Sequence, residues 1–408
     1  MGEVGAADMI YTQDGTVDFK GNPAIKKSTG NWRACPYILA NECCERLAYY
    51  GMSTNLVNFM TDKMGMTYTA AANANTNWGG TCYATTLIGA FLADAYLGRF
   101  RTIASFVIIY IIGLGLLTMS ASVKGLVPTC AAKGVCEPTA GQTAAVFVGL
   151  YLVALGTGGI KPCVSSFGAD QFDEHDDGER RSKRQSSFFN WFYFSINIGA
   201  LVASSVLVYV QERFGWGWGF GIPAVVMLIA VGSFFVGTPL YRHQRARGSP
   251  LTRIAQVLVA ATRKWSVAVS VDASALYERP DRESGKMEHT EQFRFLDKAA
   301  VETPANRAAG ASSAWRLCTV TQVEELKSVI RLLPVWASGI VFATVYGQST
   351  TMFVLHGNTL DASMGPHFSI PSASLTIFDT LSVIAWVPVY DRLLVPAARS
   401  VTGHPRGL

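Results

Sequence analysis

Long apolar runs separated by short polar segments set the pattern of this chain. The clearest run, residues 102–122, carries no charge over about 20 residues, the length that a helix needs to cross a bilayer. Residues 36–60 and 78–97 form two less pure runs. The remaining runs are residues 144–165, 188–210, 220–240, 329–355 and 375–396. A soluble protein can bury one or two such helices but not a series of eight, so the pattern predicts an all-α, polytopic membrane protein.

Composition and charge agree with this prediction. Half of the 408 residues are hydrophobic and 15% are charged, whereas soluble domains usually carry about 25% charged residues. With the N-terminus placed in the cytoplasm, cytoplasmic segments hold 28 of the 34 Lys and Arg residues and outside loops hold four. This asymmetry predicts that both termini are cytoplasmic. The basic residues form no single stripe, so the net charge of +5 gives no reason to expect nucleic acid as a partner.

The runs group into two parts. Residues 1–35 form a polar cytoplasmic tail, residues 36–240 hold six runs, residues 241–325 form a charged cytoplasmic linker, and residues 326–408 hold the last two runs. Six spans followed by a long linker and further spans are typical of the major facilitator transporters, which have two six-helix halves. We therefore expect a complete N-terminal six-helix bundle and the first two helices of a C-terminally truncated second bundle.

The linker begins with a predicted amphipathic helix. Ser249 and Pro250 suit a helix N-cap and first helical position, and Leu251, Ile254 and Leu258 follow at helical spacing. Such a helix either lies on the inner membrane surface or covers the cytoplasmic ends of the spans.

Two local signals lie elsewhere. Thr321 and Glu324 have the spacing of a capping box that opens the seventh span. Cys130 and Cys136 share an outside loop, where they form either a disulfide or two free thiols.

Ionisable residues inside the predicted spans are the candidate functional residues, because each costs about 2.5–3.5 kcal/mol to insert. Glu42, Glu45 and Arg46 share one face of the first span, with Tyr50 one turn further along. A carboxylate beside a guanidinium in a low dielectric can act as a protonation switch. The alternative is a static ion pair that holds the bundle together.

Lys161 is the other charge within the first six spans. Its partner is Glu42, Glu45 or a substrate carboxylate, unless the side chain reaches the inner interface. Asp94 and Arg99 bracket the turn between spans 2 and 3, where they either gate two helices or form a plain turn. Further polar candidates for a cavity are Tyr83, Tyr193, Asn197, Trp336, Gln348 and Asp379.

Several motifs resemble the proton-dependent oligopeptide transporter family, in its plant nitrate/peptide branch and nearest to plant di- and tripeptide transporters. They are ECCERLAYYG at 42–51, GAFLADAYLGR at 89–99, GTGGIKPCVSSFGADQF at 156–172, FFNWFYFSINIGAL at 188–201 and LLPVWASGIVFATVYGQ at 332–348. The resemblance implies that Glu42, Glu45, Arg46 and Lys161 couple protons to transport. It also implies that Tyr50, Tyr83, Lys161, Tyr193 and Asn197 contact peptide.

The resemblance further implies a proton symporter of di- and tripeptides, with protons as the coupling ion and no other cofactor. Nitrate-transporting relatives have a histidine where Tyr346 stands, which favours peptide. Four of the family's twelve spans have no counterpart here, so the alternatives are a non-transporting truncated or regulatory membrane protein, or a transporter of nitrate or another small anion. We expect the plasma membrane rather than the vacuolar membrane. An enzyme is not expected, because no nucleophile–base pair or metal cluster stands out.

Overall fold

The computed structural model describes residues 10–12, 14–132, 135–172, 178–244, 248–268, 276–278, 287–303, 313–366, 368–389 and 393–402. The chain forms two compact units. One unit comprises residues 1–93, 97–245 and 347–408, and the other comprises residues 94–96 and 246–346. The two units are described separately below.

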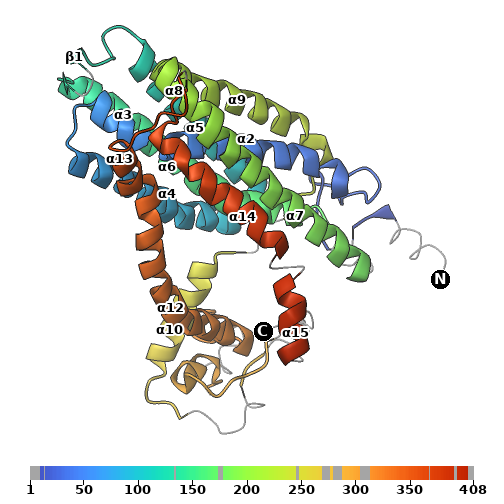
Figure 1. Ribbon diagram of the computed structural model, residues 1–408. Coiled ribbons are helices and arrows are strands. Elements are labelled where there is room, and N and C mark those ends of the chain that lie inside the picture. The colour runs from blue at the N-terminus through green and yellow to red at the C-terminus, as the bar shows by residue number, and fades with distance from the viewer. Residues whose placement is uncertain are drawn as a thin grey trace. The chain divides into compact units, whose positions relative to one another are not determined.

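Helices at all six expected places build the N-terminal half, as Figure 1 shows. Their bounds are α2 Cys35–Ser53, α4 Tyr68–Leu92, α5 Arg99–Ser122, α6 Ala140–Ala169, α7 Gly178–Val202 and α9 Trp216–Val236. Shorter elements connect them: η1 Asn31–Arg33, α3 Leu56–Asp62, η2 Ala93–Leu97, η3 Ala203–Leu207, α8 Val208–Arg213 and η4 Thr238–Leu240. α6 packs against α4 and α5, while α2 packs against α7 and α9.

Glycines set the close packing of α6. A methyl group on Gly158 would come within 2.6 Å of Thr85 on α4, and one on Gly159 would come within 2.1 Å of the Phe106 ring on α5. Helices can approach this closely only where a side chain is absent. The glycines of the GTGGIK segment therefore allow the close helix contact.

The first two spans differ from their predicted bounds. The run 36–60 is divided, because α2 ends at Ser53 and α3 begins at Leu56. Asn55 lies at this break, and its side-chain amide donates to Gln211 at 2.9 Å. The second span starts ten residues earlier than residue 78, where the Thr67 hydroxyl accepts from the backbone N–H of Ala70. The first turns of α4 are polar, so an apolar run could not reveal them.

Five described helices are long and apolar enough to cross a membrane. They are Arg99–Ser122, Ala140–Ala169, Arg184–Arg213, Trp216–Val236 and Val320–Gly357, and a shorter apolar helix covers Ser372–Trp386. α2 and α4 do not meet this criterion because they carry the charged and amide side chains. The apolar helices agree with a membrane protein.

The loop between α5 and α6 holds a disulfide. Cys130 and Cys136 are joined, and the strands β1 Cys130–Ala132 and β2 Val135–Cys136 pair in antiparallel fashion around them. Of the two alternatives left open by the sequence, the bridge is the one that forms. The loop is thereby closed over the start of α6, where the Thr139 and Gln142 side chains form a capping box.

The last residues belong to the first unit. They form η7 Gln348–Thr350, α13 Met352–Gly357, η8 Ser372–Thr376, α14 Ile377–Val389 and α15 Val395–Thr402. α14 packs against α7 (Figure 1). Asn58 at the end of the first span hydrogen-bonds to Asn358 at 2.9 Å and Ser372 at 3.3 Å. Neutral amide and hydroxyl groups therefore join the two halves on this side.

The second unit is the linker together with most of α12, Val320–Gly347. The predicted helix is present as α10, Pro250–Arg263, and the Ser249 hydroxyl caps it by accepting from Thr252 N. α10 packs against η6, Arg294–Ala300. The core of this unit is built from Val257, Ala260, Leu296, Ala299 and Val323, among others. In the middle of the linker, residues 278–292, residues 279–286 lie outside the described residues.

The predicted capping box of α12 is wrong by two residues. The box forms between Thr319 and Gln322, whose side chains accept from each other's backbone N–H groups at 3.2 and 3.0 Å. The Thr321 hydroxyl instead donates to Glu278, and Glu324 takes part in buried ion pairs. Both pairs have the right residue types, so only tertiary partners could decide between them.

Candidate functional site

The three charged residues of α2 lie together inside the bundle. The side chains of Glu42 and Glu45 are fully buried and that of Arg46 is 11% exposed. Arg46 Nε donates to Glu42 Oε1 at 2.7 Å, and it lies 3.2 Å from Glu45 Oε2 without making a hydrogen bond. The Arg46 guanidinium therefore contacts both carboxylates, but it forms a hydrogen bond only with Glu42.

Lys161 on α6 lies among the aromatic rings near this group. Its ammonium lies 3.6 Å from the centroid of the Tyr49 ring and 4.6 Å from that of the Tyr83 ring. Among the described residues, no carboxylate forms an ion pair with it. Cation–π contacts of about 0.5–2 kcal/mol thus hold a charge that a carboxylate from outside the protein could also bind.

Stacked rings fix the position of Tyr49. Its ring stacks on Trp78 at 5.6 Å, and Trp78 is held in turn because its indole N–H donates to Leu150 O at 2.8 Å. Tyr50 meets Tyr49 edge to face at 5.5 Å. Tyr49 therefore contacts both Tyr50 and Lys161, and Lys161 also contacts Tyr83. The sequence alone did not single out Tyr49.

On α7, Tyr193 and Asn197 lie one turn apart. The Asn197 amide donates to Tyr193 O at 2.8 Å, so one of its donors is used within its own helix. The Tyr193 side chain is 63% exposed. α14 packs against α7, and Asp379 is an exposed residue of α14.

The remaining second-half candidates are scattered. Trp336 is 68% exposed and lies on the part of α12 that belongs to the second unit. Gln348 lies in η7 of the first unit, where its side-chain oxygen accepts from the Thr351 hydroxyl at 3.4 Å. The structure therefore gathers the first-half candidates of α2, α4 and α6 within the first unit, whereas Trp336 belongs to the second unit.

The turn between α4 and α5 is pinned by a residue that sequence reasoning missed. Arg99 Nη1 forms an ion pair with Asp170 at 2.5 Å and donates to Ser166 O at 3.3 Å. Gly98 precedes Arg99 with φ +76°, a left-handed conformation that glycine adopts readily. Asp94 lies in the π-helical turn η2. Asp170 stands in the GADQF segment, so its motif was visible although its partner was not.

Three further buried polar residues of α2, α5 and α6 carried no sequence signal. They are Asn41 on α2, Tyr110 on α5 and Thr157 on α6, all at most 1% exposed. Neither Asn41 amide atom, nor the Tyr110 hydroxyl, nor the Thr157 hydroxyl has a hydrogen-bond partner. Tyr110 lies in a long apolar run, where no pattern distinguishes it from a core residue.

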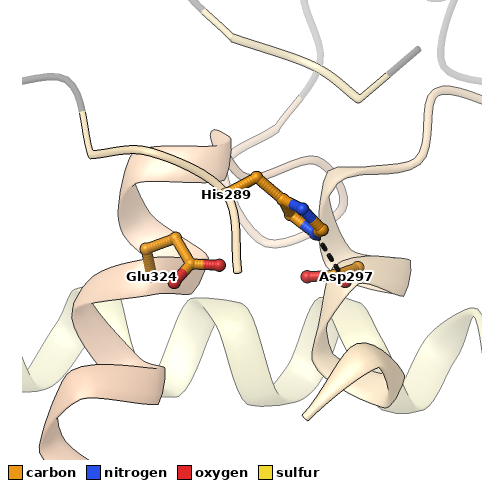
Figure 2. A group of neighbouring side chains, drawn as sticks. All are labelled: His289, Asp297 and Glu324. Atoms are coloured by element: carbon orange, nitrogen blue, oxygen red, sulfur yellow. Dashed lines mark hydrogen bonds and ion pairs between the residues drawn. The ribbon is translucent and has the colours of Figure 1, made fainter. Parts of the chain in front are cut away.

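A second buried charged group lies in the linker unit. His289, Asp297 and Glu324 bring their ligand-type atoms within 4.8 Å of one another, and Figure 2 shows the His289 ring turned towards Asp297. Lys327 Nζ lies 2.7 Å from Asp297 Oδ1 and 2.8 Å from Glu324 Oε1. Because Lys327 already pairs with both carboxylates and Arg331 also lies 3.4 Å from Glu324 Oε2, the arrangement fits an ion-pair network better than a metal site.

The sequence profile of the POT family (PTR2) matches residues 100–408. The chain is 62% identical to protein NRT1/PTR family 8.1 of Arabidopsis thaliana, over 98% of this chain and 70% of the relative. It is 63% identical to family member 8.2 of the same plant, with the same coverage.

Solved structures give the same fold. The POT family transporter PepTSo superposes with a TM-score of 0.64 at 24% identity, covering 91% of this chain and 70% of that one. An auto-inhibited POT family peptide transporter superposes with a TM-score of 0.62 at 22% identity, with the same coverage of both chains. At these identities the likeness concerns the fold.

Proposed function

Because this chain belongs to the POT family of membrane transporters, in the plant NRT1/PTR branch, we propose that it couples inward proton movement to the uptake of di- and tripeptides. The proposal places the protein in the plasma membrane with both termini in the cytoplasm. Solved relatives of the same fold are described as peptide transporters, which supports the choice of substrate.

The observation that carries this proposal is the pairing of a two-carboxylate, one-guanidinium group with a nearby lysine that has no ion pair among the described residues. Arg46 Nε donates a hydrogen bond to Glu42. It forms only an ion pair with Glu45, at 3.2 Å from Glu45 Oε2. A proton on Glu45 would leave Arg46 and Lys161 with an excess of positive charge. That excess favours binding of a substrate carboxylate to the Lys161 ammonium.

Protons and peptide are then linked by charge balance. With Glu45 ionised, the four charged groups sum to zero, and an additional carboxylate is unfavourable in a low dielectric. With Glu45 protonated, the sum is +1 and one substrate carboxylate restores neutrality. The exposed rings of Tyr83 and Tyr193 offer contact to the rest of the peptide, and Asp379 offers a carboxylate to its amino group.

Uptake in proteoliposomes tests the proposal. A labelled dipeptide should enter faster when the outside is acid, and Glu45→Gln should remove this stimulation while retaining exchange of internal for external dipeptide. Excess unlabelled dipeptide should compete, whereas nitrate should not. Uptake that ignores the pH gradient would contradict proton coupling, and competition by nitrate alone would identify an anion carrier.

A further inference from the structure

The strongest unexplained feature of the molecule is a concentration of unpaired polar atoms around Glu45. Eleven buried side-chain atoms among the described residues have no hydrogen-bond partner, and seven of them belong to Asn41, Glu42, Glu45, Tyr110 and Thr157. An unpaired buried polar group costs about 1–3 kcal/mol, so such groups are normally rare and satisfied. Their gathering in one place requires a common cause.

Other polar residues of the same bundle are paired. The Thr85 hydroxyl donates to Ala154 O at 2.9 Å, and the Thr118 hydroxyl donates to Leu114 O at 2.8 Å within its own helix. Asn55 and Gln211 hydrogen-bond to each other at 2.9 Å. The bundle therefore satisfies buried hydroxyls and amides elsewhere, and the unpaired group is a local feature rather than a property of the whole interior.

The unpaired residues come from three helices that meet. Asn41 and Glu45 lie four residues apart and therefore share a face of α2. A methyl group on Gly156 of α6 would come within 2.6 Å of Tyr110 Cβ on α5, so Thr157 lies at the level of Tyr110. Tyr110 also lies within electrostatic reach of the Glu45 carboxylate.

We propose that Asn41, Tyr110 and Thr157 hold ordered water against Glu45, and that this hydrated compartment delivers the proton to its carboxylate. Buried waters typically make about three hydrogen bonds to groups that would otherwise be unsatisfied. Two hydroxyls, an amide and two carboxylates supply donors and acceptors in the required variety. The inference rests on the proposed function, because it concerns the proton that the site is proposed to couple.

The compartment sits among defined charges. The titratable and charged groups that face Glu45 are Glu42, Arg46, Tyr49 and Tyr50 on α2, Cys82 on α4, Tyr110 on α5 and Lys161 on α6. Among them Tyr110 has a hydroxyl without any partner. Tyr110 and Thr157 are thus positioning residues, which act on Glu45 through water rather than on the peptide.

The test removes single hydroxyls with little change of shape. In lipid nanodiscs, time-resolved infrared spectroscopy after a pH jump follows the carboxyl band that Glu45→Gln abolishes. Tyr110→Phe and Thr157→Val should slow protonation of this band about tenfold, the equivalent of one hydrogen bond. Thr118→Val, which removes a hydroxyl already paired within its helix, should leave the rate unchanged. Melting temperatures of all three variants verify folding.

The outcomes separate this inference from the proposed function. A slowed band in Tyr110→Phe and Thr157→Val supports the compartment even if no peptide is transported, in which case only the proposed function falls. Proton-driven peptide uptake with an unchanged band in both variants overturns the compartment and leaves the function standing. Equal slowing in Thr118→Val would also overturn it, because the effect would then be unspecific.

Discussion

Two buried groups of charges in this chain have similar composition but opposite hydrogen bonding. The coupling cluster contains Glu42, Glu45, Arg46 and Lys161, and the linker cluster contains His289, Asp297, Glu324, Lys327 and Arg331. Two carboxylates face two cations in each. In the linker cluster each of the four carboxylate oxygens has a partner. In the coupling cluster Glu42 Oε1 accepts a hydrogen bond from Arg46 and Glu45 Oε2 only lies within ion-pair distance of it, while Glu42 Oε2 and Glu45 Oε1 have neither kind of partner.

The difference separates a structural role from a functional one. Carboxylates whose oxygens are all paired are stable in one arrangement, and removing a partner leaves a charge buried alone. Charges with unused hydrogen-bonding capacity can accept a proton, water or substrate group without first breaking a bond. Under the proposed function, the cluster in α2 and α6 is the one that changes its state of protonation.

Lys327→Met offers the strongest test of this comparison. It leaves Asp297 and Glu324 buried without their common cation, which should lower the free energy of unfolding by about 3–5 kcal/mol. Thermal unfolding of the purified protein measures the loss. The matched control is Arg294→Met in the same unit, whose ion pair with Glu291 is exposed on both sides and whose loss should change stability very little. A similar melting temperature for both variants would show that the linker cluster is not structural.

The same Lys→Met substitution in the coupling cluster should affect uptake strongly and stability little. Lys161→Met removes an ammonium that has only cation–π contacts, so the free energy of unfolding should change by about 1 kcal/mol or less. Dipeptide uptake should fall at least about thirtyfold, because the proposed partner of the peptide carboxylate is lost. Stability and uptake are measured on one preparation. Strong destabilisation with normal uptake would remove the distinction between the two clusters.

The sequence predicted the helices and the charged residues of the site, and it failed where tertiary partners decide. Hydropathy located eight helices, because lipid-facing segments must be apolar and self-satisfied in their hydrogen bonds. It misplaced the start of α4, whose first turns are polar, and the division of the first span at Asn55. In both cases a local cap or a side-chain hydrogen bond determined the boundary rather than the apolar pattern.

The sequence could predict those site residues whose placement inside a membrane costs free energy. Glu42, Glu45, Arg46 and Lys161 could be singled out because charge inside a membrane needs a reason. Tyr110 and Thr157 could not, because a tyrosine or threonine in an apolar helix usually finds a partner within reach. Only the packed bundle shows that their hydroxyls are unpaired beside Glu45. Similarly, Asp170 was visible in its motif, but its pairing with Arg99 depends on the contact between α5 and α6.

The smallest expected effect concerns His243, which lies outside both clusters and adds a separate response to acid. Burial lowers the pKa of His243, aided by Arg101 and opposed by Asp18. The folded protein therefore binds fewer protons than the unfolded chain, so stability is lost as the pH falls below about 6.5.

His243→Phe retains the ring contact with Phe100 and the backbone hydrogen bonds to Val17. It should reduce the drop in melting temperature between about pH 7 and pH 5 by the equivalent of up to about 1 kcal/mol, and leave uptake at neutral pH unchanged. If the fall in melting temperature is unaltered, His243 is not its cause. The coupling cluster would then be the source of the acid sensitivity, and its change in protonation would lower stability as well as drive transport.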